Sequence, residues 1–389
     1  MKILVHDYAG HPFQVSLSKE LKKLGHEVVH AYFLEDKGPK GDMESRDIRF
    51  EAITIPGSYS KSNFISRRFG DLKYGKKVGE LINNFRPHIV LSGNTPTEAQ
   101  EIILQNSKKI NAAFVYWCQD FYSIAAATIL ERKIPLIGNI VGHYYKYLDK
   151  KQMEASDHIV LITKNFLEQI RKWEISEDKV SVIENWGPLE EIQSYPKDNK
   201  WTREHHLNPN KVRGIYTGTL ALKHNPEILL NAAINNPNVE IVIVGFGVGY
   251  DYLKEIKTKP ENLILIPIQP FDRYSEVLAS SDFCIAIIEE EAGRFSTPSK
   301  TLSYLCAGKP ILISAPKNNL ASMIISENKC GLVSEPFNEY GIADGIKELL
   351  SQDNIEEMSF NSRTYAENYF IISKITNKFL DIFKRVIKI

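Results

Sequence analysis

Short apolar runs alternate with amphipathic stretches along most of the chain. The first apolar run, Ile3–Val5, is followed by a polar turn that contains Gly10. Residues 13–24 repeat apolar side chains at helical spacing, and residues 27–33 form the next apolar run. This pattern predicts a strand, an amphipathic helix and a second strand, which together open a doubly wound parallel sheet.

The same alternation, continued along the chain, predicts two α/β domains. Further strands are expected at 89–91, 113–117 and 159–162 in the first half, and at 215–216, 239–244, 263–265, 283–288 and 311–313 in the second. Between the halves, residues 185–211 are polar and proline-containing and show no apolar periodicity, as in interdomain linkers. We expect an N-terminal domain over 1–190, a C-terminal domain over 191–370, a cleft between them, and a helix over 371–389 that packs back on the first domain.

One short helix in the second half is delimited by clear end signals. Thr297 is a favoured N-cap, Pro298 is tolerated in the first turn, and Gly308 followed by Pro310 predicts the helix end. Lys300 lies in the first turn, where a cation opposes the helix dipole at a cost of about 0.3–1 kcal/mol. A helix start with hydroxyls, N–H groups and a lysine suits a phosphate. A solvated surface lysine is the alternative, and the helix alone does not decide between them.

Composition narrows the class of protein. The 389 residues carry a formal net charge of zero, with 43% hydrophobic and 25% charged residues, which is typical of globular proteins. Zero net charge gives no electrostatic reason to expect nucleic acid. The four cysteines have no paired spacing, which argues against a disulfide framework or a metal site. Because no signal-peptide core and no apolar run of about 18 residues occurs, we expect a cytoplasmic protein, at most peripheral to a membrane.

The loop after the first strand of the second domain has residues suited to a diphosphate. Gly218 and Thr219 open this loop, which contains Lys223 and runs to Pro226. Ligands bind at the carboxyl ends of strands in open α/β sheets, so the loop N–H groups and the lysine are candidate phosphate contacts. An exposed lysine without a ligand is the alternative.

A second glycine-containing loop, Gly245-x-Gly247-x-Gly249, follows an apolar strand and suggests a nucleotide phosphate. Its spacing differs from the dinucleotide-binding fingerprint, and a glycine-rich turn without a ligand is the alternative. No Walker A lysine motif occurs, which argues against P-loop phosphoryl transfer.

Polar side chains also follow two strands of the first domain. Asp7, Gly10 and His11 come after the first strand, and Gln119 and Asp120 come after the strand that ends at Trp117. Both turns are expected at the same edge of the sheet, facing the cleft. A carboxylate and an imidazole there would orient a hydroxyl nucleophile or stabilise a developing cation. Loop capping by the aspartates and a local hydrogen bond from the histidine are the alternatives.

Residues 60–77 mix six basic side chains with three aromatic ones. A basic, aromatic helix face of this kind can dock on anionic lipid headgroups, and residues 379–389 have a similar character. A solvated face packed on its own domain is the alternative for both segments.

Taken together, these features resemble the retaining glycosyltransferases of family 4, across essentially the whole chain. The matching segments are HDYAGHPFQ at 6–14, GHEV at 25–28, VIENW at 182–186, GTLALKHNPEILL at 218–230 and PSKTLSYLCAGKP at 298–310. The resemblance implies a GT-B architecture of two Rossmann-like domains, a nucleotide-sugar donor on the second, an acceptor on the first, and neither metal nor other cofactor. Among family members, the chain looks most like the bacterial enzymes that assemble O-antigen, capsule or colanic acid.

The resemblance also assigns roles to single positions. It makes Lys223 the diphosphate-binding lysine and places Asp120 near a polar residue that faces the cleft. The other matched positions are Gly10 and His11 in the first-strand loop, Gly218, Thr219, Gly245 and Gly247 near the donor, and Ser299, Lys300 and Ser303 at the donor-binding helix start.

The chain departs from the family at its usual pair of glutamates, spaced E-x7-E, which would fall at Phe295 and Ser303. The second glutamate ordinarily holds the donor ribose and the first is often assigned to the sugar. A less polar sugar pocket would suit a deoxy or N-acetylated sugar, with residues 289–291 or Arg294 as substitutes.

The resulting hypothesis is transfer of a hexosyl or N-acetyl-deoxyhexosyl group from a UDP-sugar, with retained configuration, to a polyprenyl-diphosphate-linked acceptor. Lys223, Lys300 and helix N–H groups would stabilise the departing diphosphate. A nucleotide-sugar epimerase of the same architecture and a non-catalytic nucleotide-sugar-binding subunit are the alternatives.

Overall fold

The computed structural model describes residues 1–36, 41, 43, 47–55, 64–124, 127, 130, 135–288, 299–336, 338–351 and 355–387. The chain forms two compact units, Met1–Asn185 with Ile372–Ile389, and Trp186–Ile371. Each unit is built on one parallel sheet, so the predicted class of two doubly wound α/β domains is confirmed.

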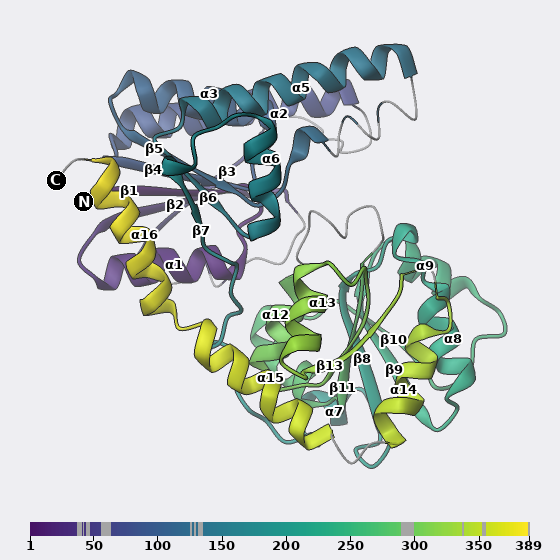
Figure 1. Ribbon diagram of the computed structural model, residues 1–389. Coiled ribbons are helices and arrows are strands. Elements are labelled where there is room, and N and C mark those ends of the chain that lie inside the picture. Colours follow the sequence, from purple (N-terminus) through teal and green to yellow (C-terminus); the bar gives the residue numbers. More distant parts are fainter. Residues whose placement is uncertain are drawn as a thin grey trace. The chain divides into compact units, whose positions relative to one another are not determined.

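Seven parallel strands form the sheet of the first unit, in the order β3-β2-β1-β4-β5-β6-β7 (Figure 1). The central strand β1 pairs with β2 through Ile3 opposite Val28, and with β4 through Ile3 opposite Ile89. Because the central strands are buried on both faces, they read in the sequence as continuous apolar runs. The strands are β1 (Lys2–Asp7), β2 (Glu27–Phe33), β3 (Arg49–Ile53), β4 (Ile89–Gly93), β5 (Ala113–Cys118), β6 (His158–Leu161) and β7 (Val180–Val182).

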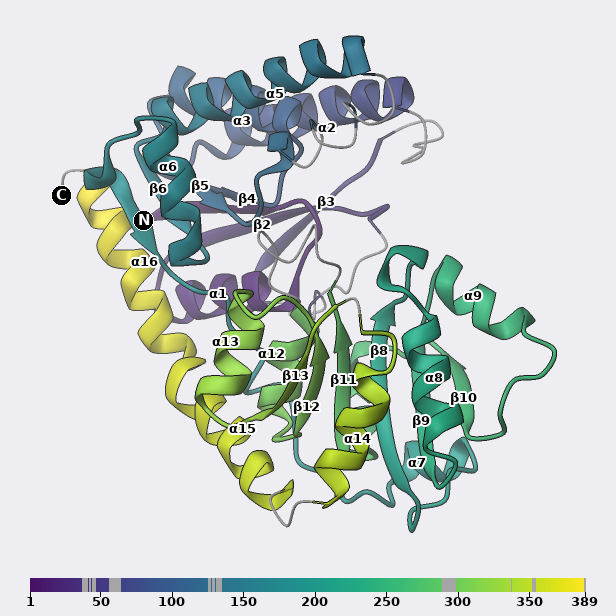
Figure 2. The same ribbon diagram turned by 45° about the vertical axis from the view of Figure 1, so that its right-hand side comes forward.

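Helices cover both faces of this sheet. α2, α3 and α5 lie on one face, and α1 and α16 lie on the other (Figure 1, Figure 2). The helices are α1 (Pro12–Lys23), α2 (Phe64–Phe85), α3 (Thr97–Lys109), α5 (Pro135–Ala155), α6 (Leu167–Lys172) and α16 (Ile372–Val386), with the short 3-10 helices η1 (Lys164–Phe166) and η2 (Glu177–Lys179).

The C-terminal helix α16 belongs to the core of the first unit. Its apolar side chains Ile375, Phe379 and Phe383 are buried, and the Phe379 ring lies 4.9 Å from the Trp117 ring of β5. The apolar face of this helix therefore packs on its own unit, which is the alternative that the sequence left open for residues 379–389.

The second unit contains six parallel strands in the order β10-β9-β8-β11-β12-β13. The strands are β8 (Val212–Thr219), β9 (Val239–Phe246), β10 (Leu263–Pro267), β11 (Phe283–Ile287), β12 (Ile311–Ser314) and β13 (Gly331–Ser334). The helices are α7 (Lys200–Glu204), α8 (Glu227–Asn235), α9 (Val248–Glu255), α10 (Tyr274–Ala279), α12 (Ser299–Cys306), α13 (Leu320–Glu327), α14 (Gly341–Ser351) and α15 (Ile355–Tyr369), with η3 (Leu222–His224) and η4 (Phe271–Arg273).

Successive side chains of β8 enter different cores. Tyr216 packs with side chains of α8, α9 and α14 on one face of the sheet, whereas Ile215 packs with Trp201 and Val277 on the other. This alternation is what a strand buried on both faces requires. The alternation also determines toward which face of the sheet each side chain at the end of the strand points.

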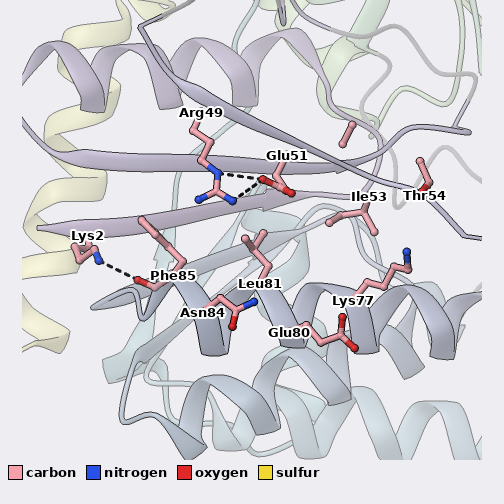
Figure 3. A pocket seen from close by; sticks show the side chains of 11 residues that line it. Lys2, Arg49, Glu51, Ile53, Thr54, Lys77, Glu80, Leu81, Asn84 and Phe85 are labelled. Atoms are coloured by element: carbon pink, nitrogen blue, oxygen red, sulfur yellow. Dashed lines mark hydrogen bonds and ion pairs between the residues drawn. The ribbon is translucent and has the colours of Figure 1, made fainter.

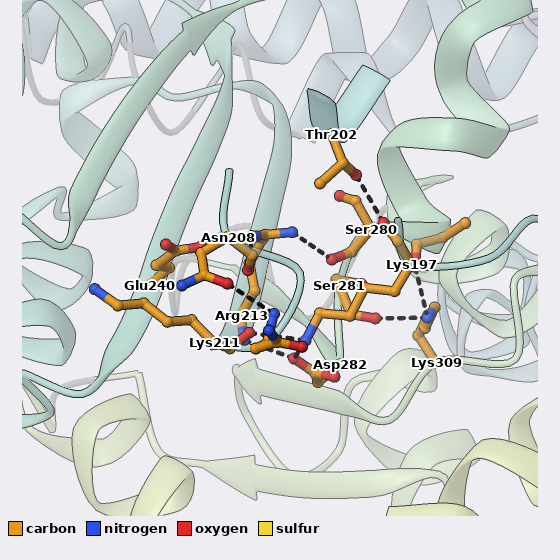
Figure 4. A network of polar contacts seen from close by, with 12 residues as sticks. Lys197, Thr202, Asn208, Lys211, Arg213, Glu240, Ser280, Ser281, Asp282 and Lys309 are labelled. Atoms are coloured by element: carbon orange, nitrogen blue, oxygen red, sulfur yellow. Dashed lines mark hydrogen bonds and ion pairs between the residues drawn. The ribbon is translucent and has the colours of Figure 1, made fainter. Parts of the chain in front are cut away.

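A buried ion pair holds the amino ends of the strands in the second unit (Figure 4). The Arg213 guanidinium is inaccessible to solvent and donates to the Glu240 carboxylate through Nε at 2.9 Å and Nη2 at 2.6 Å. Two backbone carbonyls, of Ser280 and Asn208, accept one further hydrogen bond each, from Nη1 and Nη2, at 2.8 Å. Since every side of the guanidinium is bonded, this pair is structural, and it lies at the opposite end of β8 from Thr219.

The order in which strands are added to the sheet reverses beside β1 in the first sheet and beside β8 in the second. In each case the next strand along the chain pairs on one side, and a later strand, β4 or β11, pairs on the other. Open α/β sheets bind ligands outside the carboxyl ends of the strands at this switch point. The two candidate sites therefore lie after β1 and after β8.

Candidate functional site

The loop after β8 leaves open space beside Gly218. This glycine has φ +91°, a value that side-chain-bearing residues rarely adopt, and an added Cβ would meet no atom within 4 Å. Thr219 ends the strand, and Lys223 follows within the 3-10 helix η3. The position of the Lys223 side chain lies outside the described part of the structure.

The glycines after β9 allow this loop to pack closely on the loop after β8. An added Cβ at Gly245 would collide with the Gly218 carbonyl oxygen, and one at Gly247 would lie 2.7 Å from that of Leu220. Gly249 donates its N–H to the same Leu220 oxygen at 2.9 Å. Packing of the two backbones thus accounts for the spacing of the three glycines, whether or not a donor approaches them.

Lys300 lies in the first turn of α12, as the sequence predicts, and Gly308 ends that helix at φ +62°. The Lys300 Nζ lies 3.7 Å from the centroid of the Tyr216 ring. Burial lowers the pKa of Lys300 to about 7, and no described carboxylate offsets this effect. Among the described residues, Lys300 is therefore a half-buried amine whose neighbour is an aromatic ring rather than an anion.

Hydroxyl groups connect α12 to β8 below this lysine. The Tyr304 hydroxyl accepts a hydrogen bond from the Thr217 N–H at 3.0 Å, and the Thr217 hydroxyl lies 2.9 Å from that of Tyr274. Ser303, only 9% exposed, is hydrogen-bonded to Tyr274 as well, whereas Ser299 is exposed at the start of the helix. Ser303 therefore links α12 to Tyr274 of α10, which in turn contacts Thr217 of β8.

The segment before α12 holds the substitutes proposed for the family's glutamate pair. Residues 289–291 and Arg294, together with Phe295 and the N-cap Thr297, fall outside the described residues.

In the first unit, the loop after β1 is organised by the buried carboxylate of Asp7. It accepts hydrogen bonds from the backbone N–H of Ala9, at 3.2 Å, and of His11. The side-chain amide of Gln14, in the orientation that satisfies its neighbours, donates to the same carboxylate. Gly10 adopts φ +74° between these contacts. Capping by Asp7, which the sequence offered as an alternative, is thus one of its roles.

His11 forms an ion pair with Asp7 at this edge of the sheet. Its Nδ1 lies 3.4 Å from the Asp7 carboxylate, and its side chain is 22% exposed. Burial lowers the pKa of His11, but the Asp7 carboxylate, with smaller contributions from Asp36 and Gln14, outweighs burial, so that the pKa is raised above 6.5. A protonated imidazole with one edge open to solvent can donate a proton or stabilise a developing negative charge.

Asp120 follows β5 at the same edge and stands near a tyrosine that the sequence analysis did not single out. The hydroxyl of Tyr122 donates to the Asn94 side chain at 3.2 Å. Burial, and then the charge of Asp120, raise the pKa of Tyr122, which keeps it a neutral donor. The next residue, Ser123, donates its N–H at 3.2 Å to the buried Asp149 carboxylate of α5. A tyrosine two residues after the predicted Gln119-Asp120 pair was the only signal in the sequence.

The positive charge of the basic segment on α2 is partly neutralised, and one aromatic side chain of this segment is exposed. Arg68 pairs with the buried Glu98 at 2.7 Å, and Phe69 is exposed.

A second exposed surface lies on α5, where one helical face exposes the large side chains Ile140 (74%), Tyr144 (44%) and Tyr147 (64%). The pKa of the Arg68 guanidinium is raised mainly by the Glu98 carboxylate and, to a smaller extent, by Tyr145 and Tyr144 of α5. Apolar spacing along 135–155 predicts a helix but not which of its faces stays exposed.

A separate cavity of about 400 Å³ lies between β3 and α2 (Figure 3). Arg49 and Glu51 on its wall pair with each other at 2.8 Å, and Lys2 donates to the Phe85 carbonyl at 3.0 Å. None of the predicted catalytic or donor-binding residues lines it, although Lys77 of the basic segment does. Its charges are largely paired, and we assign it no role.

Neither a metal-binding cluster nor a membrane-spanning helix is found among the described residues. No cluster of three or more His, Cys, Asp or Glu side chains suited to a metal ion occurs within the described ranges. None of the helices in those ranges combines the length and the apolar character needed to cross a membrane.

Most of the second unit matches the model of a known protein family. Residues 197–368 match the family model described as glycosyl transferases group 1. No curated protein sequence matches the chain. Among solved structures, the chain is similar to HepE of Anabaena in complex with UDP, at 15% identity and a TM-score of 0.72, over 99% of this chain and 100% of that one.

Two further structures share the fold. Sucrose-phosphate synthase from Thermosynechococcus elongatus aligns at 12% identity and a TM-score of 0.75, over 99% of this chain and 98% of that one. WaaG, a glycosyltransferase involved in lipopolysaccharide biosynthesis, aligns at 14% identity and a TM-score of 0.68, over 96% and 98%. Residues 197–368 thus match the glycosyl transferases group 1 family model, and the whole chain shares the GT-B fold of these solved structures.

Proposed function

We propose that the protein is a retaining glycosyltransferase that moves a sugar from a UDP-sugar to a lipid-linked or glycan acceptor in the assembly of bacterial surface polysaccharide. The observation that carries the donor assignment is Lys300, half-buried at the switch point of the glycosyltransferase domain with no described anion beside it. A diphosphate would supply that anion. HepE, which shares the fold, was solved with UDP and with UDP-glucose, which supports a uridine nucleotide as the donor carrier.

In this proposal the second unit stabilises the leaving diphosphate. Lys300 and Lys223 supply positive charge, and the N–H groups around Gly218 and Thr219 supply hydrogen-bond donors. Removing one such preorganised contact typically costs about 3–4 kcal/mol of barrier lowering. Gly245 and Gly247 contribute by bringing the second loop close, and Ser299 adds a hydroxyl at the start of α12.

The first unit would bind the acceptor near the ends of β1 and β5. His11 and Asp120 are the proposed catalytic side chains, with Gly10 allowing the turn between Asp7 and His11. A protonated His11 suits an anionic group on the acceptor, such as the diphosphate of a polyprenyl-linked glycan. The exposed aromatic and basic side chains of α2 and α5 would allow this unit to rest on a membrane surface that carries such an acceptor.

Ser303 limits what the site can hold. Its hydroxyl is engaged with Tyr274, so we propose that the donor ribose is held by other groups. A serine in place of a glutamate also makes this part of the pocket less polar, which suits a deoxy or N-acetylated sugar.

Radiolabelled sugar transfer tests the proposal. Incubation with UDP-sugars and membrane extracts that contain polyprenyl-diphosphate-linked glycans is expected to label the lipid fraction, and chelation of metals with EDTA is expected to leave the rate unchanged. Lys223→Ala should lower turnover about 100-fold or more, with the exposed Lys347→Ala of α14 as the matched control. Near-normal transfer by Lys223→Ala would exclude the phosphate role of that lysine.

The same assay separates the alternatives. Conversion of the UDP-sugar to a different sugar without an acceptor would indicate an epimerase. Binding of UDP-sugars without any product, across a panel of acceptors, would indicate a non-catalytic subunit.

A further inference from the structure

Tyr216 contacts both parts of the proposed donor site. The face of its ring lies 3.7 Å below the Lys300 Nζ of α12. Its hydroxyl donates a hydrogen bond to the Thr219 carbonyl at 2.7 Å, in the loop after β8. One side chain therefore links the lysine to the loop that would share the same diphosphate.

The fold leaves this tyrosine no freedom to move. Tyr216 is inaccessible to solvent, because its ring packs in the core formed with α8, α9 and α14. The positive φ of Gly218 turns the chain just beyond it, so that the Thr219 carbonyl comes back within reach of the hydroxyl. The ring is thus a fixed platform rather than an adaptable contact.

The charge state of Lys300 depends on what occupies the site. Burial lowers the pKa of Lys300 to about 7, so the amine is partly neutral near physiological pH. The ring face of Tyr216 favours the ammonium form through a cation–π interaction. A bound diphosphate would favour the ammonium far more, because opposite charges within about 4–6 Å shift a pKa by about 1–3 units.

The other titratable groups on the elements around α12 do not change charge in the same range. Burial raises the pKa values of Tyr274 on α10, Tyr304 on α12 and Cys284 on β11, the last to about 12. Burial also raises the pKa of Tyr216 itself. On α15, Arg363 donates to the Cys306 carbonyl at the far end of α12 and pairs with Glu367. Of the described groups named here, Lys300 is therefore the one whose charge changes between pH 7 and 8.5.

We propose that Tyr216 is a positioning residue that holds Lys300 and the loop after β8 against one diphosphate, and that diphosphate binding is coupled to uptake of one proton by Lys300. This inference rests on the proposed function, because it takes the ligand to be the diphosphate of the donor. The proton comes from solvent, protonates the neutral amine, and leaves an ammonium paired with a phosphate oxygen.

The coupling has a measurable size. With a pKa of about 7 in the ligand-free protein, about a quarter of the protein carries a protonated Lys300 at pH 7.5, so UDP binding should take up about 0.75 proton. Above pH 7.5, UDP affinity should fall by nearly tenfold for each pH unit, since only the protonated form pairs with the phosphate. UDP itself changes charge mainly near pH 6, below this range.

Calorimetric titration of the full-length protein with UDP, at pH 7.5 and 8.5 and in two buffers of different ionisation enthalpy, tests this inference. Lys300→Arg, whose guanidinium does not titrate, should bind UDP with no proton uptake and with an affinity that is flat across this range. The exposed Lys347→Arg is the matched control and should behave as the wild type does.

Two substitutions separate the roles of the tyrosine. Tyr216→Phe keeps the ring and loses the hydroxyl, and should weaken UDP about 2- to 10-fold with the proton uptake retained. Tyr216→Leu also loses the ring, and should weaken UDP about 10-fold or more while proton uptake at pH 7 rises. That rise is a readout that a purely structural role would not produce. Thermal unfolding of both variants shows whether they fold.

The outcomes distinguish this inference from the proposed function. If UDP binds the wild type but its affinity is flat between pH 7.5 and 8.5, or if Lys300→Arg keeps the wild-type slope, the coupling is refuted and the proposed function survives. If both tyrosine variants fold and bind UDP as the wild type does, the positioning role is refuted. If neither UDP nor any UDP-sugar binds the wild type at any pH, the proposed function itself fails.

Discussion

The ion pair between Asp7 and His11 makes a prediction whose sign is fixed by the structure. Burial lowers the pKa of His11, whereas the Asp7 carboxylate 3.4 Å away raises it, with smaller contributions from Asp36 and Gln14, and together the raising effects outweigh burial. Asp7→Asn removes the charge and keeps the shape. The pKa of His11 should then fall, because the main effect that raises it is removed. Loss of an opposite charge at such a distance typically changes a pKa by about 1–3 units, or about 1.4–4 kcal/mol.

Histidine titration by NMR measures this change, with His11→Gln used to assign the signal. Asp36→Asn is the matched control, because Asp36 also raises the pKa of His11 but less than Asp7 does. Its effect should therefore be smaller. A His11 pKa in Asp7→Asn that does not fall below the wild-type value would refute the reasoning, since Asp7 would then not be the main cause of the raised pKa.

The same pair predicts how stability depends on pH. The folded-state pKa of His11 is raised, so its contribution is complete below 6.5 and is lost as the pH rises through the folded value. The folded-state pKa of Asp7 is lowered, because His11 outweighs the opposing effect of burial, so its contribution is lost only on acidification below 3.8. The stability difference between wild type and Asp7→Asn should therefore shrink between pH 6 and 9.

Three further predictions concern other parts of the chain. Arg213→Met leaves the Glu240 carboxylate buried without its partner and should destabilise the protein by about 3–5 kcal/mol, lowering the melting temperature by about 10 °C; the double variant Arg213→Met/Glu240→Leu should recover most of this, and no recovery would contradict the ion-pair explanation. Gly245→Ala should destabilise by about 2 kcal/mol through its contact with the Gly218 carbonyl, whereas Gly345→Ala in α14, where an added Cβ would lie 3.6 Å from Leu312, should be neutral or stabilising in thermal unfolding. Tyr144→Ser/Tyr147→Ser on α5 should weaken co-sedimentation with anionic vesicles several-fold, and Tyr340→Ser, an exposed tyrosine of the second unit, should not; equal binding by all three proteins would exclude the α5 surface.

Periodicity predicted the architecture because both sheets are parallel and doubly wound. Strands buried on both faces, such as β1 and β9, read as unbroken apolar runs, and the helices between them keep their own spacing. End signals were equally informative at Gly308, whose positive φ is the conformation that a glycine after a helix favours.

The site could be predicted only in part. Lys300 and Asp7 were found because an unusual residue type marked a helix start or a strand end. Tyr216 was not, since a tyrosine inside a strand looks like any other core residue until the ring is seen below Lys300. The glycines after β9 were consistent with a nucleotide-phosphate loop and with a turn that binds no ligand. Close contact between the backbones of the loops after β8 and β9 is sufficient to require them.

The central claim is that the second unit binds a nucleotide-sugar donor through its diphosphate. Calorimetric titration with UDP at pH 7 tests this most directly, using the wild type and Lys300→Met. The account predicts saturable binding of one UDP per chain by the wild type, and binding weakened at least 30-fold in Lys300→Met, since a charge-assisted hydrogen bond contributes about 2 kcal/mol or more. Failure of the wild type to bind UDP, or equal binding by Lys300→Met, would contradict it.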